Sequence, residues 1–148
     1  MCARFSDRWL RRTLRIVSRA HLVAHRVTGG RVGAHWRGAD VVMITTIGRT
    51  SGRRHTTPLL FLPYGAGIAV VASSAGTEHP PHWWHNLQRE PRAHLEIAGT
   101  RKRVVARAAD THEQAFVSAR FREVFPRFDR YRHRAHRDIP VVLLEPLS

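Results

Sequence analysis

Cysteine is nearly missing from this sequence, and lysine and acidic residues are scarce. Cys2 is the only cysteine among 148 residues, which excludes an intramolecular disulfide and a thiolate metal cluster. Lys102 is the only lysine among the 25 basic residues, and with 11 acidic residues the formal net charge is +14. This surplus predicts nonspecific attraction to phosphates, anionic lipids and nucleic acids.

Long hydrophobic runs are missing as well. The longest apolar stretches fall far short of the roughly 20 residues that a membrane-spanning helix needs. Arginines interrupt every apolar run in the first thirty residues, so no secretory signal is expected. With 43% hydrophobic residues, the chain can still bury one real core. We therefore expect a cytoplasmic, globular protein.

Residues 1–27 have the pattern of an amphipathic helix. Apolar residues recur near a period of 3.6, seven arginines lie between them, and Thr28-Gly29-Gly30 ends the pattern. One interpretation is a helix that caps the domain with its arginines in solvent. The other is an interfacial helix on an anionic membrane, with the apolar face among the headgroups. We divide the chain into this helix with its linker, residues 1–38, and a globular domain, residues 39–148.

From residue 40 onward the pattern is mainly that of short strands. β-branched and other apolar residues predict strands over residues 41–46, 56–62, 68–73, 94–97, 104–108 and 139–144. Pro80 and Pro81 open a short helix that runs to about Arg89. A second helix is expected over residues 111–125, with Thr111 as its N-cap. The predicted fold class is α+β: a small antiparallel β-barrel with flanking helices.

Two segments carry residues suited to ligand binding. Gly48-Arg49-Thr50-Ser51-Gly52 is a predicted turn whose backbone N–H groups could form an anion-binding nest, with arginine and hydroxyl donors beside it. A charged hairpin tip is the simpler interpretation of the turn alone. In the second segment, the strand that ends at Ala72-Ser73-Ser74 would let a flat ring approach the backbone. Of Trp83 and Trp84, we expect one in the core and the other over the barrel opening.

The order of these motifs resembles the deazaflavin-dependent nitroreductase and quinone reductase family. The resemblance covers about residues 40 to 146, and the succession of motifs is far more specific than any single one. It rests on Thr45-Thr46-x-Gly48-Arg49-x-Ser51-Gly52, Thr56-Thr57-Pro58-Leu59, Ala72-Ser73, Pro81-x-Trp83-x-x-Asn86-Leu87, Pro91 and Asp138-Ile139-Pro140-Val141-Val142.

The resemblance implies a split β-barrel of the flavin-binding type over residues 39–148. It also implies a coenzyme, F420 (8-hydroxy-5-deazaflavin), in preference to FMN, whose reduced form delivers hydride to a quinone, a nitro compound or another activated acceptor. The implied contacts to the phosphate and acidic tail of the coenzyme are Arg49, Thr50, Ser51, His55, Thr56 and Thr57. Those to its ring are Val71, Ala72, Ser73 and Ser74 on one side, and His82, Trp83, Trp84, His85 and Asn86 on the other.

Tyr131 and Ser73 are the candidate catalytic residues, as donors of a proton or a hydrogen bond to the acceptor. Packing or ring contact is the simpler role for both. Tyr131 alone keeps a hydroxyl in a segment that is tyrosine-rich in some relatives, which argues against nitro-drug reduction. The sequence also departs from the family pattern at Thr50, His55 and Ser74, where basic residues are usual, and Arg53 and Arg54 would compensate for the lost charge.

Three alternatives stay open at this point. A metal site at His79, His82 and His85 is disfavoured because neither cysteine nor a nearby carboxylate accompanies them. Nucleic-acid binding is suggested by the charge and by the arginines of residues 127–137, but no recognition motif accompanies them and they fit a solvated basic surface. The same fold could also hold FMN, haem or a lipid. Neither the oligomeric state nor the identity of the acceptor follows from the sequence.

Overall fold

The computed structural model describes residues 35–36 and 39–147, and the predicted helix of residues 1–27 lies outside this range. The strands are β1 (His35–Trp36), β2 (Ala39–Ile47), β3 (Arg54–Leu60), β4 (Leu62–Tyr64), β5 (Gly67–Val71), β6 (Arg92–Ile97), β7 (Thr100–Ala108) and β8 (Val141–Pro146). The helices are a 3-10 turn η1 (Ser74–Gly76), α2 (His82–Arg89), α3 (Thr111–Val124) and α4 (Arg127–Ala135).

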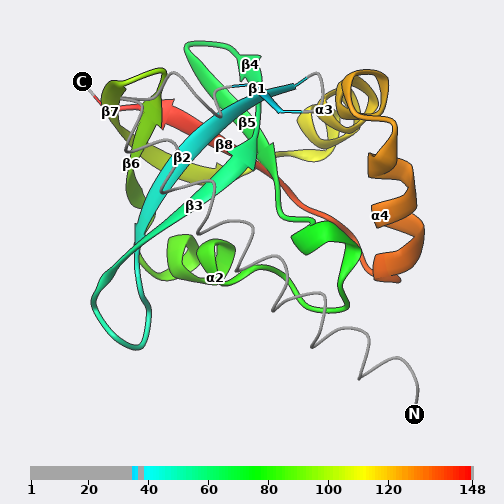
Figure 1. Ribbon diagram of the computed structural model, residues 1–148. Helices are drawn as coiled ribbons and strands as arrows, with labels where there is room; N and C mark the ends of the chain where they lie inside the picture. The colour runs from blue at the N-terminus through cyan, green and yellow to red at the C-terminus, as the bar shows by residue number, and fades with distance from the viewer. Residues whose placement is uncertain (1–34, 37–38, 148) are drawn as a thin grey trace.

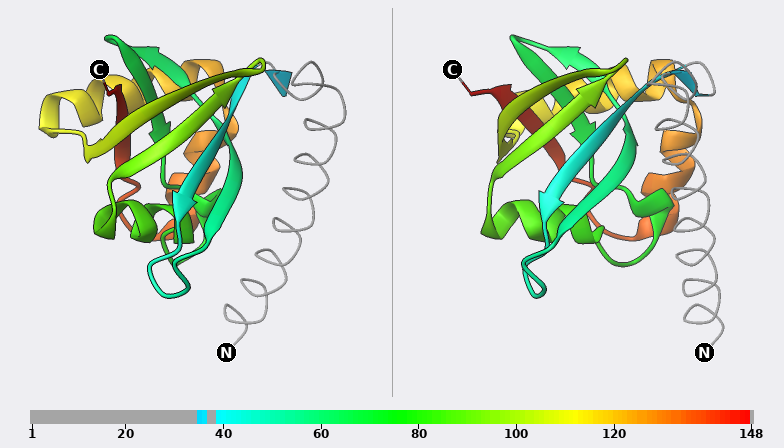
Figure 2. Two further views of the ribbon diagram at one scale, coloured as in Figure 1. Left: turned by 90° about the vertical axis from the view of Figure 1, so that its left-hand side faces the viewer. Right: turned by 60° about the vertical axis from the view of Figure 1, so that its left-hand side comes forward.

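The strands form one curled antiparallel sheet (Figures 1 and 2). Its order is β1-β2-β6-β7-β8-β5-β4, and β3 pairs with β2 outside this path. β3 also contacts β5, which draws two separate parts of the sheet together. The predicted α+β, split-barrel fold is therefore confirmed. Because β2 and β3 pair in register from Val41↔Leu60 to Ile47↔Arg54, the turn between them extends beyond the end of the sheet near α2.

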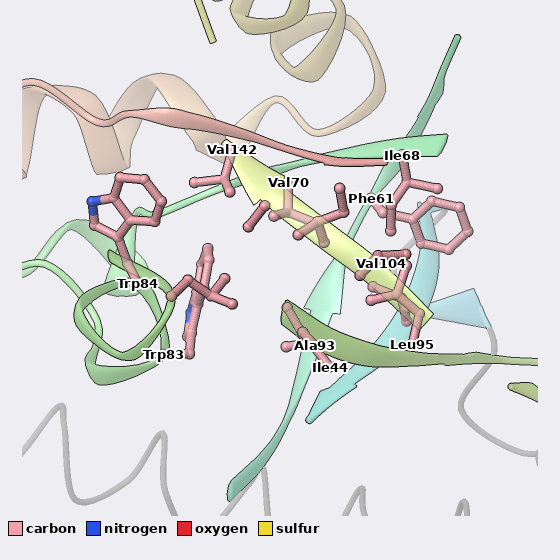
Figure 3. Close-up of a cluster of buried hydrophobic side chains, with 14 of the residues drawn as sticks. Ile44, Phe61, Ile68, Val70, Trp83, Trp84, Ala93, Leu95, Val104 and Val142 are labelled. Carbon is pink, nitrogen blue, oxygen red and sulfur yellow. The ribbon is translucent and has the colours of Figure 1, made fainter. Parts of the chain in front are cut away.

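The core consists of two clusters, one on each face of the sheet. The inner cluster joins α2 to inward residues of β2, β5, β6, β7 and β8 (Figure 3). The outer cluster lies between the sheet and helices α3 and α4. In β8, Val142 and Leu144 belong to the inner cluster, whereas Val141 and Leu143 belong to the outer one. A strand covered on both faces needs an uninterrupted apolar run, which is why this segment shows no polar alternation.

Several predicted elements need correction. The structure has eight strands in its described part, where six were expected, because residues 35–36 and 62–64 form short strands of their own. Strands β6 and β7 extend beyond their apolar residues, since antiparallel backbone pairing continues through the charged positions 101–103. The N-cap of α3 is Asp110 and not Thr111, and it forms a capping box with Glu113.

Helix α4 is the largest departure from the sequence prediction, which treated its arginines as part of a solvated basic surface. Phe128 and Ala135 are buried on one face, while the charged residues occupy the others. Only Phe128, Tyr131 and Ala135 of this helix contribute to the outer cluster, so the apolar stripe is too thin to stand out in the sequence.

Candidate functional site

The β2–β3 turn is closed by its own backbone. The Gly48 N–H donates to the Arg53 carbonyl at 2.7 Å, and the Gly52 N–H donates to the Gly48 carbonyl at 2.9 Å. Gly52 has a φ of +67°, a conformation that favours glycine. The Arg53 N–H donates to Ser51 Oγ at 3.2 Å. The N–H groups of Gly48, Gly52 and Arg53 are therefore already used within the turn, and an anion-binding nest built on the other N–H groups stays a prediction.

Asn86 of α2 connects the turn to the sheet. Its Oδ1 accepts hydrogen bonds from the Arg49 backbone N–H at 3.1 Å and from Arg49 Nη1 at 3.2 Å. Its Nδ2 donates to Thr46 Oγ1 at 3.1 Å. Asn86 and Thr46 are both buried, so each of these polar groups needs its partner. Asn86 therefore acts on the site by holding Arg49 in place.

The Arg49 guanidinium lies against the first turn of α2. Nη1 donates to the His82 carbonyl at 3.5 Å, and Nη2 lies 3.3 Å from His82 Nδ1. These partners are the Asn86 side-chain amide oxygen, the His82 carbonyl and the His82 imidazole. Among the described residues no salt bridge to a carboxylate includes Arg49, so its positive charge is held in position by hydrogen bonds.

The neighbouring side chains of β3 divide between the two faces of the strand. His55 Nε2 lies 3.2 Å from Ser51 Oγ. A Cβ atom at position 48 would lie only 2.5 Å from that same Oγ, so the glycine leaves room for the Ser51 hydroxyl. Thr56 Oγ1 lies 2.8 Å from Thr45 Oγ1 of the paired strand. Because side chains alternate along a strand, His55 and Thr57 share one face and Thr56 lies on the other. The six tail contacts implied by the family resemblance are thus not all on one surface.

The two tryptophans of α2 are both buried. Trp83 keeps 6% and Trp84 9% of its surface exposed, and both point into the inner cluster (Figure 3). The expectation that one of them covers the barrel opening is wrong. A helix that closes one end of the sheet can bury adjacent positions when the core surrounds that end. His82 is exposed and His85 half-buried on the same helix.

The predicted strand over residues 68–73 is shorter in the structure: β5 ends at Val71, Ala72 and Ser73 follow it, and Ser74 is the first residue of η1. Arg137 holds this segment, and sequence reasoning missed it. Among the described residues, the acceptors of the Arg137 guanidinium are all main-chain carbonyls, at 3.1 to 3.4 Å: those of Ala72, Ser73, Thr77, His79 and Asp138. Burial lowers the pKa of Arg137 from its ordinary value. The Arg137-Asp138-Ile139-Pro140 run was the only available signal, and it gives no indication of these distant acceptors.

Tyr131 lies on the α4 side of the same segment. Its ring centroid is 5.8 Å from that of Phe125, and it packs against the outer cluster. Its backbone contacts Gly76, where an added Cβ atom would lie 2.8 Å from Tyr131 Cα. The ring packing agrees with the simpler of its two expected roles.

The described residues contain no group of three or more metal-ligating side chains that could hold an ion. Within the same part of the chain, no helix is both long and apolar enough to cross a membrane.

Comparison with known proteins places the chain in a family. The family model described as F420H(2)-dependent quinone reductase matches residues 17–146. The F420H(2)-dependent quinone reductase Rv1261c of Mycobacterium tuberculosis is 31% identical over 145 residues, which is 93% of this chain and 96% of that protein. A second protein of M. tuberculosis, the putative F420H(2)-dependent quinone reductase Rv3178, is 32% identical over 117 residues, covering 78% and 98% of the two chains.

Solved structures agree with this result. A structure described as F420-H2 dependent reductase FDR-A superposes with a TM-score of 0.65 at 26% identity, over 74% of this chain and 95% of the other. The haem storage protein HutZ from Vibrio cholerae, at 18% identity and a TM-score of 0.52 over 73% and 82% of the two chains, shares the fold alone. On the family match and these relatives, the chain belongs to the F420H(2)-dependent quinone reductase family.

Proposed function

We propose that this protein transfers hydride from reduced coenzyme F420 to a quinone. Membership of the F420H(2)-dependent quinone reductase family carries the proposal. The nucleic-acid, FMN, haem and lipid alternatives have no comparable support. When bound, the coenzyme supplies the hydride, and the protein has to bind it, orient it and exclude water.

The charges of the chain fit the acidic part of this coenzyme. Residues 41–77 include no aspartate or glutamate but do include Arg49, Arg53, Arg54 and His55. Arg49 is held by the amide of Asn86 and forms no ion pair with any residue that the structure describes, so its charge is available to a ligand. A polyanionic tail beside this turn would gain charge-assisted hydrogen bonds without an opposing acidic side chain. Arg53 and Arg54 are exposed, and they could replace the charge missing at Thr50 and His55.

For the ring, we assign the segment from Val71 to Ser74 and the exposed part of α2 near His82 as the binding surface. The half-buried Ser73 and Ser74 are small enough to let a flat ring reach the backbone. Ser73 remains our candidate hydrogen-bond donor to the acceptor. Tyr131 is the weaker candidate because its ring packs against Phe125.

The test is a titration of the purified protein with coenzyme F420, FMN and FAD in parallel, followed by steady-state oxidation of the reduced coenzyme with menadione. We expect F420 to bind most tightly and its oxidation to depend on both quinone and protein. Equal or tighter binding of FMN would contradict the proposal. A nitroaromatic acceptor belongs in the same assay, and we expect it to react more slowly than menadione.

We further propose that residues 1–27 attach the domain of residues 39–148 to anionic membrane, where lipophilic quinones are dissolved. The support is the sequence pattern, with seven arginines among apolar residues at helical spacing. Removal of residues 1–27 should abolish co-sedimentation with vesicles that contain phosphatidylglycerol and leave coenzyme binding intact. Loss of folding would mean that the segment is part of the core. Continued sedimentation would instead implicate the basic residues 127–137.

A further inference from the structure

Arg137 is placed by the end of α4. His136 terminates the helix in the left-handed conformation, with a φ of +48°, and the chain then turns toward β8. The Arg137 side chain returns across the segment of residues 72–79, which lies between β5 and α2 (Figure 1). No salt bridge of the described residues includes it. Within the described part of the chain, this half-buried guanidinium therefore depends on carbonyl oxygens for its hydrogen bonds.

The segment that it holds has an unusual backbone. Ser74 has a φ of +46°, a value that residues other than glycine rarely adopt, and Gly76 has a φ of +77°. Gly76 also lies so close to Tyr131 that a Cβ atom would meet its backbone oxygen at 2.8 Å. Strained backbone of this kind persists only where its surroundings fix it, and it is frequent in ligand-binding segments. Arg137 supplies such a constraint through its hydrogen bonds, and α4 supplies one through the close approach of Tyr131 to Gly76.

The direction of two peptide units follows from these contacts. Arg137 Nη2 donates to the Ala72 and Ser73 carbonyls, both at 3.1 Å. In a planar trans peptide the N–H points away from the C=O of the same unit. The N–H groups of Ser73 and Ser74 therefore point away from the guanidinium. Within the described residues neither N–H donates a hydrogen bond, whereas the preceding Ala72 N–H donates to the Pro140 carbonyl at 3.0 Å.

We propose that Arg137 is a positioning residue that fixes the Ser73 and Ser74 N–H groups as a pair of donors for the carbonyl oxygens of the coenzyme ring. This inference rests on the proposed function and extends it to Arg137, which lies outside the motifs that carry the family resemblance. A guanidinium is suited to the role because its planar fork can reach several carbonyls at once, whereas the lysine ammonium is a point charge on a flexible stem.

The test separates the ring of the coenzyme from its tail. Two ligands are titrated by fluorescence: complete coenzyme F420, and the 8-hydroxy-5-deazaflavin riboside, which lacks the phosphate and the acidic tail. The variants are Arg137→Gln, Arg137→Lys and the matched control Arg130→Gln, which removes one exposed charge from the preceding helix α4. We expect Arg137→Gln and Arg137→Lys to weaken binding of the riboside at least tenfold and to shift the absorption maximum of the bound ring. Arg130→Gln should change neither.

The outcomes distinguish this inference from the function on which it depends. If the wild-type protein binds neither ligand, the proposed function is wrong. If it binds both and Arg137→Gln binds the riboside with unchanged affinity and spectrum, the positioning role is wrong. Full rescue by Arg137→Lys would show that only the charge matters, and would also overturn the proposal.

A second variant keeps the test decisive if Arg137→Gln does not fold. Ser73 has a φ of −80°, which proline can adopt, so Ser73→Pro removes one of the two N–H donors and leaves Arg137 in place. We expect a comparable loss of riboside affinity and the same spectral shift. Unchanged binding by the folded Ser73→Pro variant would exclude the Ser73 N–H as a donor and overturn the proposal.

Discussion

At the scale of single residues, the arginines of this protein serve different purposes. Arg107 is paired with Glu113 at 2.8 Å and with Glu145 at 2.9 Å, so its charge is compensated. In the part of the chain that the structure describes, Arg49 and Arg137 form hydrogen bonds but no salt bridge. Arg137 stabilises backbone, and Arg49 keeps a charge available for an anionic ligand.

The first residue-scale test is Arg49→Ala. We expect the variant to remain folded and to bind F420 more weakly by about 1.5–3 kcal/mol, the scale of a charge-assisted hydrogen bond. The same F420 titration of the variant Arg89→Ala controls for the change in net charge, because it removes an exposed arginine from the far end of α2. Equal losses in the two variants would mean that the turn does not bind the coenzyme.

Replacement of Asn86 tests the link between the turn and α2. Asn86→Leu has a similar volume but leaves the buried Thr46 hydroxyl and the Arg49 N–H without this partner. We expect the free energy of unfolding in urea to fall by about 1–3 kcal/mol. F420 affinity should fall as well, because Arg49 would no longer be oriented. The double variant Asn86→Leu/Arg49→Ala should lose little more affinity than Arg49→Ala alone. Additive losses would show that Asn86 contributes to binding independently.

At the scale of elements, α3 is fixed at its start by a small network of charges. Asp110 Oδ1 accepts from the Glu113 N–H, and Glu113 Oε2 accepts from the Asp110 N–H. Arg107 donates to both carboxylate oxygens of Glu113. The hydrogen bonds from the Arg107 guanidinium have the largest effect on the pKa of Glu113, and the hydrogen bond from the Asp110 backbone N–H has the next largest. Together they lower this pKa from 4.5 to about 2.

This shift predicts the direction of a pH effect. The folded state binds the Glu113 proton more weakly than the unfolded chain does, so the stabilisation is fully present above pH 4.5. It is lost as the pH falls from 4.5 through about 2. When thermal melting is measured between pH 6 and about 2, the melting temperature should therefore fall less on acidification in Glu113→Gln than in the wild type. Parallel curves for the two proteins would exclude a contribution from this carboxyl.

At the scale of the whole molecule, a net charge of +14 acts on every anionic ligand. Increasing the ionic strength from about 0.05 M to about 0.5 M shortens the screening length from over 10 Å to a few ångströms. We expect the Kd of complete F420 to rise about tenfold, equivalent to about 1.4 kcal/mol. The tail-free riboside should change little under the same conditions. Similar salt dependence for the two ligands would argue against tail recognition by basic residues.

The sequence by itself determined the fold class and the family. β-branched runs, glycine turns and the uninterrupted apolar segment at the C-terminal strand are local signals, because strand formation and burial on two faces constrain neighbouring positions directly. The motif order from Thr45 to Val142 was enough to indicate the family, which the comparisons confirm. The division at residue 38 stays a prediction.

Only the tertiary structure decided what individual side chains do. Asn86 meets Arg49 across 37 residues of sequence, and Arg137 meets Ala72 across 65. The run that follows Arg137 gives no indication of its distant acceptors, and nothing near Trp84 shows that it is buried. Such contacts depend on how the curled sheet brings α2 and α4 to the end of β5. They are set by packing between distant elements, for which a local pattern has no signal.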